Sequence, residues 1–226
     1  MTRTPSAWIV MKFGGTSVST LANWTNIARV AAERCAGGAS VLIVHSAVTG
    51  ITDRLERLLD AAIGQAQEEE LRAIEERHRR LAAELGVALG DDVERHLAEL
   101  REIAAGVALV GEVSDHTRAR VMASGELMAT QIGACFLRAR GLEVAWADAR
   151  TMLRAEERHS ATPKASVLSA VCGFAPDAAL EERLQGLAPV VVTQGFIASD
   201  CDGNTVLLGR GGSDTSAAYF AAKLRA

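Results

Sequence analysis

Two pairs of glycines stand beside cations in this sequence, and phosphate binding is the chemistry that such an arrangement favours. Lys12-Phe13-Gly14-Gly15 and Arg210-Gly211-Gly212 are each followed by hydroxyl side chains and then by helix-like sequence. Glycine lets the backbone approach a phosphate closely, and the free N–H groups of a helix start carry partial positive charge. A single glycine pair is most simply a turn, but two such helix starts facing each other would hold a polyphosphate. The spacing matches neither the Walker A loop nor the GxGxxG dinucleotide fingerprint.

Apolar runs alternate with helical patterns along the chain, which predicts an α/β protein. Ala7–Phe13 and Ser40–His45 read as buried strands on either side of a helix at Val18–Arg34, which ends at Gly37-Gly38. This βαβ unit predicts a mainly parallel sheet with helices on its faces. Later predicted elements are a helix at Ser124–Arg140, strands at Leu142–Trp146, Ser166–Val171 and Pro189–Ala198, a hairpin turn at Asp202-Gly203 into Thr205–Leu208, and a last helix at Thr215–Leu224.

A charged helical region interrupts this pattern from Ile51 to about Val110, most clearly over residues 55–110. Its apolar residues recur every three or four positions, as in Leu71, Ile74, His78, Leu81 and Leu85. Runs such as Gln67–Glu70 predict a solvated face with local ion pairs. We expect a helical excursion from the α/β core.

Composition and charge exclude several classes of protein. The net charge of −4 over 226 residues argues against a nucleic-acid partner. No apolar run reaches the ~20 residues of a membrane span, and Met1–Ser6 has no signal-peptide core. The four cysteines and five histidines follow no metal-ligand spacing. We therefore expect a cytoplasmic protein with no metal site of its own, in which His45, Trp8 and Trp24 are structural.

Four motifs occur in order: KFGGTSV, SAVTGITD, SGELMAT and TQGFIASDCDGNTVLLGRGGSDTSAA. From Val10 to Ala226 the chain thereby resembles the catalytic domain of aspartate kinases, in the amino-acid kinase superfamily. The run VHSAVTGITDRL is similar to the kinase half of bifunctional aspartate kinase/diaminopimelate decarboxylase proteins. The resemblance implies a three-layer α/β/α sandwich of the carbamate kinase-like type. It also implies transfer of a phosphoryl group from Mg-ATP to the side-chain carboxylate of L-aspartate, giving 4-phospho-L-aspartate, the first step towards lysine, threonine and methionine.

The expected chemistry needs charge neutralisation more than proton transfer, because a carboxylate nucleophile is already ionised at neutral pH. No catalytic histidine is therefore expected. The resemblance implies that Arg210 binds the α-carboxylate of aspartate, that Glu126 accepts from its α-ammonium, and that Thr52 and Ser46 hydrogen-bond the substrate. Lys12 would hold the transferred group and Asp214 would orient Lys12 or a metal-bound water. The expected phosphate-binding set is Lys12, Gly14, Gly15, Gly211, Gly212 and Ser213, with Mg²⁺ bound mainly through the ATP phosphates.

Each of these acidic or hydroxyl residues also has a structural alternative. Glu126 could favour the dipole of a helix that starts nearby. Thr52 could cap a helix that begins at Asp53, and Ser213 or Asp214 could cap the last helix.

The resembled kinases continue beyond the helix that follows the second glycine pair. We therefore expect residues 1–226 to form the substrate-side lobe of an amino-acid kinase domain that is incomplete at its C-terminus, without the nucleotide-binding half and the ACT regulatory domains. Weak nucleotide affinity is expected, and residues 1–226 alone are expected to show little or no turnover. A homo-oligomer is expected for the full-length protein. Two alternatives stay open: a truncated, non-catalytic module that binds a ligand or partner, and a kinase for another small amino acid such as glutamate.

Overall fold

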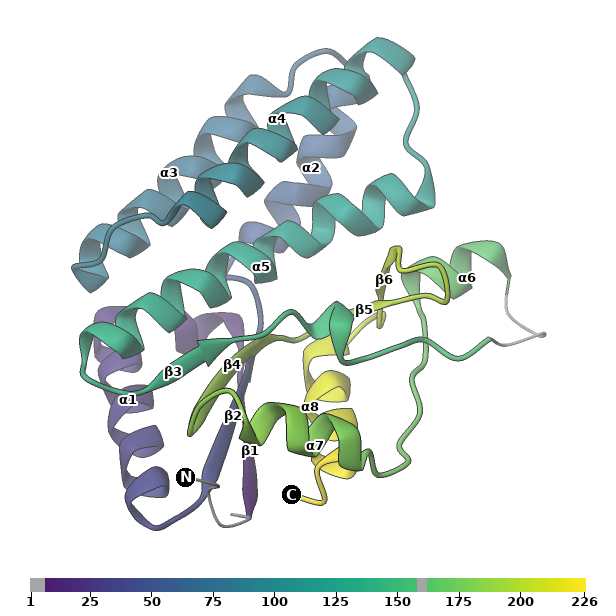
Figure 1. Cartoon of the computed structure of the whole chain (residues 1–226). Helices are drawn as coiled ribbons and strands as arrows, with labels where there is room; N and C mark the ends of the chain where they lie inside the picture. The colour runs from purple at the N-terminus through teal and green to yellow at the C-terminus, as the bar shows by residue number, and fades with distance from the viewer. Residues whose placement is uncertain (1–6, 158–161) are drawn as a thin grey trace.

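The central sheet has four strands, and its pairings are parallel. The computed structural model describes residues 7–157 and 162–226. Strands β1 (Trp8–Phe13), β2 (Ser40–His45), β4 (Val190–Gln194) and β3 (Val144–Trp146) lie side by side in that order (Figure 1). The inner strands β2 and β4 are buried along their whole length, as continuous apolar runs predict. The prediction of a buried strand at Ala7–Phe13 is wrong in its burial, because β1 lies at the edge of the sheet and only its first residue, Trp8, is buried. The expected α/β class with a mainly parallel sheet is confirmed.

Helices cover both sides of this sheet. In Figure 1, α1 (Leu21–Ala36) and α5 (Asp115–Ala139) lie on one side, whereas α7 (Ala178–Gln185) and α8 (Gly212–Lys223) lie on the other. Helix α5 packs on β3 and β4, and α8 packs on β1 and β2. The layers are those of the expected three-layer sandwich.

The first helix begins later than the sequence pattern predicted. Residues Gly15–Val18 form a short 3-10 turn (η1), and α1 starts only at Leu21. The reason is the side chain of Thr20, which accepts a hydrogen bond from the Asn23 N–H (3.3 Å) and so caps the helix at this point. The end of α1 at Gly37 agrees with the prediction.

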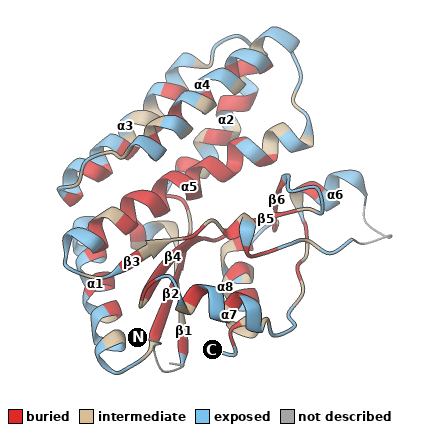
Figure 2. Cartoon of the chain, in the orientation of Figure 1, coloured by how far each residue is buried: buried red, intermediate tan, exposed pale blue. Residues whose placement is uncertain are grey.

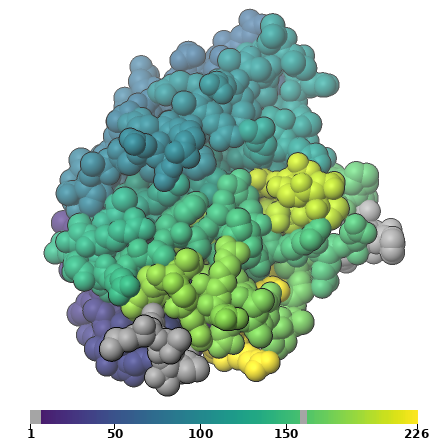
Figure 3. All heavy atoms as spheres, viewed as in Figure 1, coloured from purple at the N-terminus to yellow at the C-terminus, as the bar shows by residue number. Residues whose placement is uncertain are grey.

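The helical region consists of three helices that pack against α5 and against one another. These are α2 (Ile51–Ile63), α3 (Glu68–Leu85) and α4 (Asp91–Val110), and Figure 3 shows their atoms continuous with those of α5. The predicted apolar stripe of α3 is buried, and its charged side chains form surface ion pairs such as Arg79–Glu75 (2.8 Å). Among the helices that the structure describes, none combines the length and the apolar character needed to cross a membrane.

Helix α5 is longer and more deeply buried than predicted. It begins at Asp115, where the Ser114 hydroxyl accepts from the Thr117 N–H (3.1 Å), and not at Ser124. Every residue from Val121 to Ala134 is buried (Figure 2), because α5 lies between the sheet and the helical region. The amphipathic pattern expected for a surface helix is therefore absent from this stretch.

A glycine in α5 allows the close approach of α1, and this gives a stability prediction. A Cβ on Gly133 would lie 2.1 Å from Trp24 Cη2, and Trp24 is fully buried with its indole N–H bonded to the Val18 carbonyl (2.9 Å). We expect Gly133→Ala to lower the free energy of unfolding by about 1–3 kcal/mol through overpacking. Gly106→Ala in α4 is the matched control, because its Cβ would meet nothing within 4 Å. It should raise stability by about 0.5–1 kcal/mol. Urea denaturation measures both, and equal shifts would contradict the packing argument.

Two predicted strands are corrected by the structure. Residues Ser166–Val171 do not form a strand: α6 (Pro163–Leu168) occupies this region, with the Thr162 hydroxyl as cap (3.2 Å from the Ala165 N–H) and proline at the first helical position. The strand predicted at Pro189–Ala198 is broken after Gln194, because Phe196 adopts a left-handed backbone conformation (φ +71°). The chain then continues as β5 (Ile197–Ser199), which pairs antiparallel with β6 (Thr205–Leu207) and confirms the predicted hairpin.

Candidate functional site

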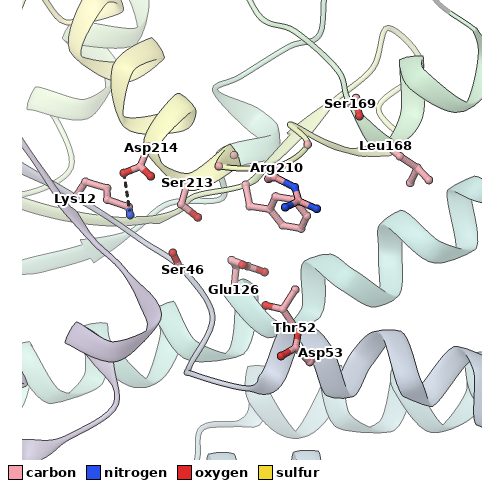
Figure 4. A pocket seen from close by; sticks show the side chains of 14 residues that line it. Lys12, Ser46, Thr52, Asp53, Glu126, Leu168, Ser169, Arg210, Ser213 and Asp214 are labelled. Carbon is pink, nitrogen blue, oxygen red and sulfur yellow. Dashed lines mark ion pairs between the residues drawn. The ribbon is translucent and has the colours of Figure 1, made fainter.

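A pocket of about 620 Å³ lies beyond the carboxyl ends of β1 and β2. This is the edge at which ligands bind in open α/β sheets. Strand β1 contributes Lys12, the chain just after β2 contributes Ser46, and α8 with the loop before it covers the other side (Figure 4). The lining residues are Lys12, Ser46, Thr52, Asp53, Glu126, Leu168, Ser169, Phe196 and Gly209 to Asp214.

Most of the residues predicted for the site meet in this pocket. Lys12, Ser46, Thr52, Glu126 and the run Arg210 to Asp214 all line it, although they come from β1, α2, α5, α8 and two loops. The structure therefore brings together groups that are up to about two hundred positions apart in the sequence.

The first glycine pair differs from its prediction. Gly14 and Gly15 are not among the residues that line the pocket. Gly14 is the N-cap of the four-residue 3-10 turn η1 and Gly15 is its first residue, so this glycine pair does not open an α-helix. The expected pair of facing helix starts is thus wrong on this side, because the α-helix is capped further on, at Thr20. Gly15 has a packing role, since a Cβ there would lie 2.8 Å from the Ala47 carbonyl oxygen. Gly14 lies near the cation: its Cβ would be 3.7 Å from Lys12 Nζ.

The second glycine pair opens a true α-helix at the pocket. Helix α8 starts at Gly212, three residues earlier than predicted, with Gly211 (φ +73°) as its N-cap and no side-chain cap. The alternative that Ser213 or Asp214 caps this helix is therefore wrong. Among the described residues the Ser213 N–H has no hydrogen-bond partner, so the helix start offers a free donor.

The start of α8 is fixed against the break between β4 and β5. The Ser216 hydroxyl accepts from the Phe196 N–H (2.9 Å) and donates to the Gly212 carbonyl (2.7 Å). A Cβ on Gly212 would lie 2.7 Å from Phe196 Cδ2, and one on Gly195 would lie 2.6 Å from Ser213 Cβ. The two glycines thus permit a contact that holds the helix start beside the sheet.

Lys12 and Asp214 form an ion pair across the pocket mouth, with Nζ 2.9 Å from Oδ1 (Figure 4). The Asp214 side chain is 74% exposed, so the pair contributes little to stability. Its main effect is on position, because it fixes where the Lys12 ammonium points.

Glu126 is a buried carboxyl group in the middle of α5, so the alternative of a helix-start residue is wrong. It is 3% exposed, its Oε1 accepts from the Ala47 N–H (3.1 Å), and its Oε2 has no hydrogen-bond partner among the described residues. Burial raises the pKa of this carboxyl to about 8. A buried acceptor without a donor, at the wall of a pocket, indicates a place for a donor from a ligand.

The raised pKa predicts a pH dependence of stability. The folded-state pKa of Glu126 is about 8, above its ordinary value of 4.5. The carboxyl therefore stabilises the fold fully below about pH 4.5, and this contribution is lost as the pH rises through about 8. From about pH 6 to about pH 8.5 we expect wild type to lose roughly 2–3 kcal/mol more unfolding free energy than Glu126→Gln. Urea denaturation at both pH values tests this, and the exposed Glu102→Gln serves as control. If the unfolding free energy falls by the same amount in wild type and in Glu126→Gln, the prediction is wrong.

Thr52 and Arg210 present free polar groups from opposite walls (Figure 4). Thr52 lies in the first turn of α2, whose N-cap is Gly50 (φ +81°), so the alternative of a Thr52 cap is wrong. Arg210 is exposed, and no carboxylate in the described part of the chain pairs with its guanidinium. An unpaired guanidinium that faces a pocket is suited to bind a carboxylate through two parallel hydrogen bonds.

Sequence reasoning missed five residues of the lining: Asp53, Leu168, Ser169, Phe196 and Gly209. Asp53 follows Thr52 in the same helical turn, and Gly209 belongs to the quoted glycine-rich run. Phe196 follows a glycine inside an apolar run, a signal for a break in a strand. Leu168 and Ser169 could not be found, because their segment was predicted as a strand and is the end of α6.

The fold is that of an α/β protein with a pocket beyond the carboxyl ends of its parallel strands, which is where ligands bind in such folds. Residues 7–226 match the Amino acid kinase family, and the chain belongs to this family.

Relatives and solved structures agree with this assignment. The chain is 33% identical over 222 residues to lysine-sensitive aspartokinase 3 of Escherichia coli K12, covering 96% of this chain and 47% of that protein. It is 31% identical over 221 residues to an aspartokinase of Chlamydia pneumoniae, with coverage of 96% and 45%. A crystal structure of E. coli aspartokinase III in complex with aspartate and ADP (R-state) superposes with a TM-score of 0.80 at 31% identity, covering 98% of this chain and 47% of that one. The chain thus spans about half the length of the curated relatives it matches.

Proposed function

We propose that this chain forms the substrate-side lobe of an aspartate kinase. In the proposed reaction the γ-phosphoryl group of Mg-ATP passes to the side-chain carboxylate of L-aspartate and gives 4-phospho-L-aspartate, the first step towards lysine, threonine and methionine. The observation that carries the proposal is the pocket itself. It is lined by a buried carboxyl group with one unpartnered oxygen, by a guanidinium that has no ion-pair partner among the described residues, and by a lysine of β1 that pairs with the first turn of α8. The relatives named aspartokinase, and the neighbour solved with aspartate and ADP, support it.

Recognition of the amino acid rests on groups of opposite charge. Arg210 binds the α-carboxylate through its planar fork, which lysine would match less well. Glu126 accepts a hydrogen bond from the α-ammonium at its unpartnered Oε2. Thr52 and Ser46 hydrogen-bond the substrate from the opposite wall. A buried acceptor that needs a cation favours a free amino acid over an N-acylated one, because an acylated nitrogen carries no charge.

Phosphoryl transfer rests on the glycine-rich side of the pocket. Lys12 holds the transferred group and Asp214 orients Lys12 through their ion pair. The helix start donates the N–H groups of Gly211 and Ser213 to the phosphates, because the Gly212 N–H is already bonded to the Gly209 carbonyl (3.0 Å). Gly14 leaves room beside Lys12, since a Cβ there would lie 3.7 Å from Lys12 Nζ. The aspartate carboxylate is already ionised, so no residue acts as general base.

Magnesium fits this site as a partner of ATP. When bound, it would neutralise negative charge on the phosphate oxygens while the aspartate carboxylate attacks the γ-phosphorus. No cluster of three or more histidine, cysteine or acidic residues among the described residues could hold a metal ion by itself. We propose that the ion would be held mainly through the ATP phosphates.

Formation of an acyl phosphate tests the proposed function directly. The chain, supplied with the C-terminal half that is expected to carry the nucleotide-binding residues, is incubated with Mg-ATP and L-aspartate in the presence of hydroxylamine, which converts an acyl phosphate into a hydroxamate. We expect aspartate hydroxamate together with ADP, and neither product when L-aspartate is left out. A larger yield with L-glutamate would show that the chain is a kinase for another amino acid.

A further inference from the structure

The free site holds an acid that has no counter-charge of its own. Glu126 is 3% exposed, receives one backbone hydrogen bond at Oε1, from the Ala47 N–H, and leaves Oε2 without a partner among the described residues. Removing an ionised carboxylate from water is costly unless a cation or several donors compensate it. One N–H group is too little compensation, so the free site keeps this carboxyl protonated.

The charged groups around the pocket do not provide the missing cation. Lys12 of β1 is already paired with Asp214 of α8. Asp53 of α2 is itself acidic and cannot act as a counter-charge. Arg210, in the loop before α8, is a cation but forms no ion pair with Glu126. His45, the last residue of β2, directly precedes the pocket residue Ser46 and is fully buried. Burial lowers the pKa of His45 to about 4, so its imidazole is neutral and supplies no positive charge.

We propose that L-aspartate binds to this site with the release of one proton from the Glu126 carboxyl, so that substrate affinity increases with pH. This inference rests on the proposed function, because it requires a ligand whose ammonium group reaches Oε2. The exchange is balanced: the carboxylic acid and the ammonium ion become a carboxylate–ammonium pair, and one proton passes to solvent. No oxidant, metal or further reactant takes part.

The direction of the pH effect follows from the two states of the acid. In the free protein the pKa of Glu126 is about 8, and in the complex the adjacent ammonium holds it well below this value. At about pH 7 the free carboxyl is mostly protonated, so binding should release most of one proton per L-aspartate bound. The dissociation constant should fall about tenfold per pH unit between about pH 6 and about pH 7.5, and level off above about pH 8.

Isothermal titration in two buffers of different ionisation enthalpy counts the released protons. Wild-type chain is titrated with L-aspartate at about pH 7 in each buffer, and the difference in heat gives the proton number. Succinate is the matched ligand, since it has the same two carboxylates and no ammonium; it should release no proton. Glu126→Gln is the matched variant, because the amide keeps the shape of the side chain but has no acidic proton. Any L-aspartate binding that remains in it should be weaker, release no proton and be independent of pH over this range.

The outcomes separate the two proposals. Proton release near one that disappears in Glu126→Gln supports the inference. Binding of L-aspartate by wild type without proton release overturns the inference and leaves the proposed function standing. Equal proton release by Glu126→Gln also overturns it, because the proton must then come from another group. No L-aspartate binding by folded wild-type chain overturns the proposed function itself, and with it this inference.

Discussion

Arg210→Ala is expected to weaken L-aspartate binding by roughly 100-fold. The guanidinium is the cation that the pocket offers without an ion-pair partner among the described residues, and two parallel charge-assisted hydrogen bonds to the α-carboxylate would be lost together. A loss of about 2–3 kcal/mol corresponds to this factor. Because Arg210 is exposed in the free chain, its removal should leave folding stability nearly unchanged.

Calorimetric titration of L-aspartate measures the Arg210 effect. Arg210→Lys keeps the charge but not the planar fork, so its affinity should lie between those of wild type and Arg210→Ala. Arg72→Ala is a suitable control, since Arg72 is an exposed arginine of α3 whose ion pair with Glu76 is long (4.0 Å). If Arg210→Ala and Arg72→Ala bind L-aspartate equally well, Arg210 does not bind the substrate.

Lys12→Met is expected to slow phosphoryl transfer by about 10²–10³-fold and to change L-aspartate affinity by less than about threefold. Its ammonium lies at the pocket mouth, paired with Asp214 at 2.9 Å and next to Gly14, where it can neutralise charge on the transferring group. A single preorganised donor of this kind typically contributes that much to a rate. Methionine preserves most of the side-chain length and leaves the apolar contacts of β1 in place.

Initial rates of ADP formation at saturating L-aspartate test the Lys12 prediction. Asp214→Asn should give a smaller decrease than Lys12→Met, because it frees the ammonium without removing it. Lys164→Met, an exposed lysine of α6 that does not line the pocket, is the control. An unchanged rate in Lys12→Met, or a loss of aspartate affinity as large as the loss of rate, would place Lys12 outside phosphoryl transfer.

Much of the fold follows from local sequence patterns. The strands β1, β2 and β4 and the hairpin of β5 and β6 were predictable, because continuous apolar runs and an Asp-Gly turn have few other solutions. The partial burial of β1 was not, because it depends on the place of this strand at the edge of the sheet. Helix starts were less predictable. The caps at Thr20 and Ser114 decide where α1 and α5 begin, and a hydroxyl residue in a loop does not reveal by itself whether it caps a helix. Residues Ser166–Val171 were predicted as a strand from their β-branched content, although the Thr162-Pro163 start favours a helix.

Part of the pocket lining could be predicted from sequence motifs, whereas the environment of these residues could not. Lys12, Thr52, Glu126 and Arg210 could be selected by motif, since each stands in a recognisable run. The burial of Glu126 could not, because it depends on α5 being covered by both the sheet and the helical region. The different surroundings of the two glycine pairs, a 3-10 turn for one and an α-helix for the other, also depend on tertiary contacts. The similarity to decarboxylase-fused kinases and the assignment of the lobe stay predictions.

The most direct measurement is calorimetric titration of the folded wild-type chain with L-aspartate and, in parallel, with N-acetyl-L-aspartate. The two ligands share both carboxylates and differ in the charge of the nitrogen that Glu126 is proposed to bind. The proposal predicts one L-aspartate bound per chain and no measurable binding of the acetylated ligand. No binding of L-aspartate, or equal binding of both ligands, would contradict a free amino acid site built from Glu126 and Arg210.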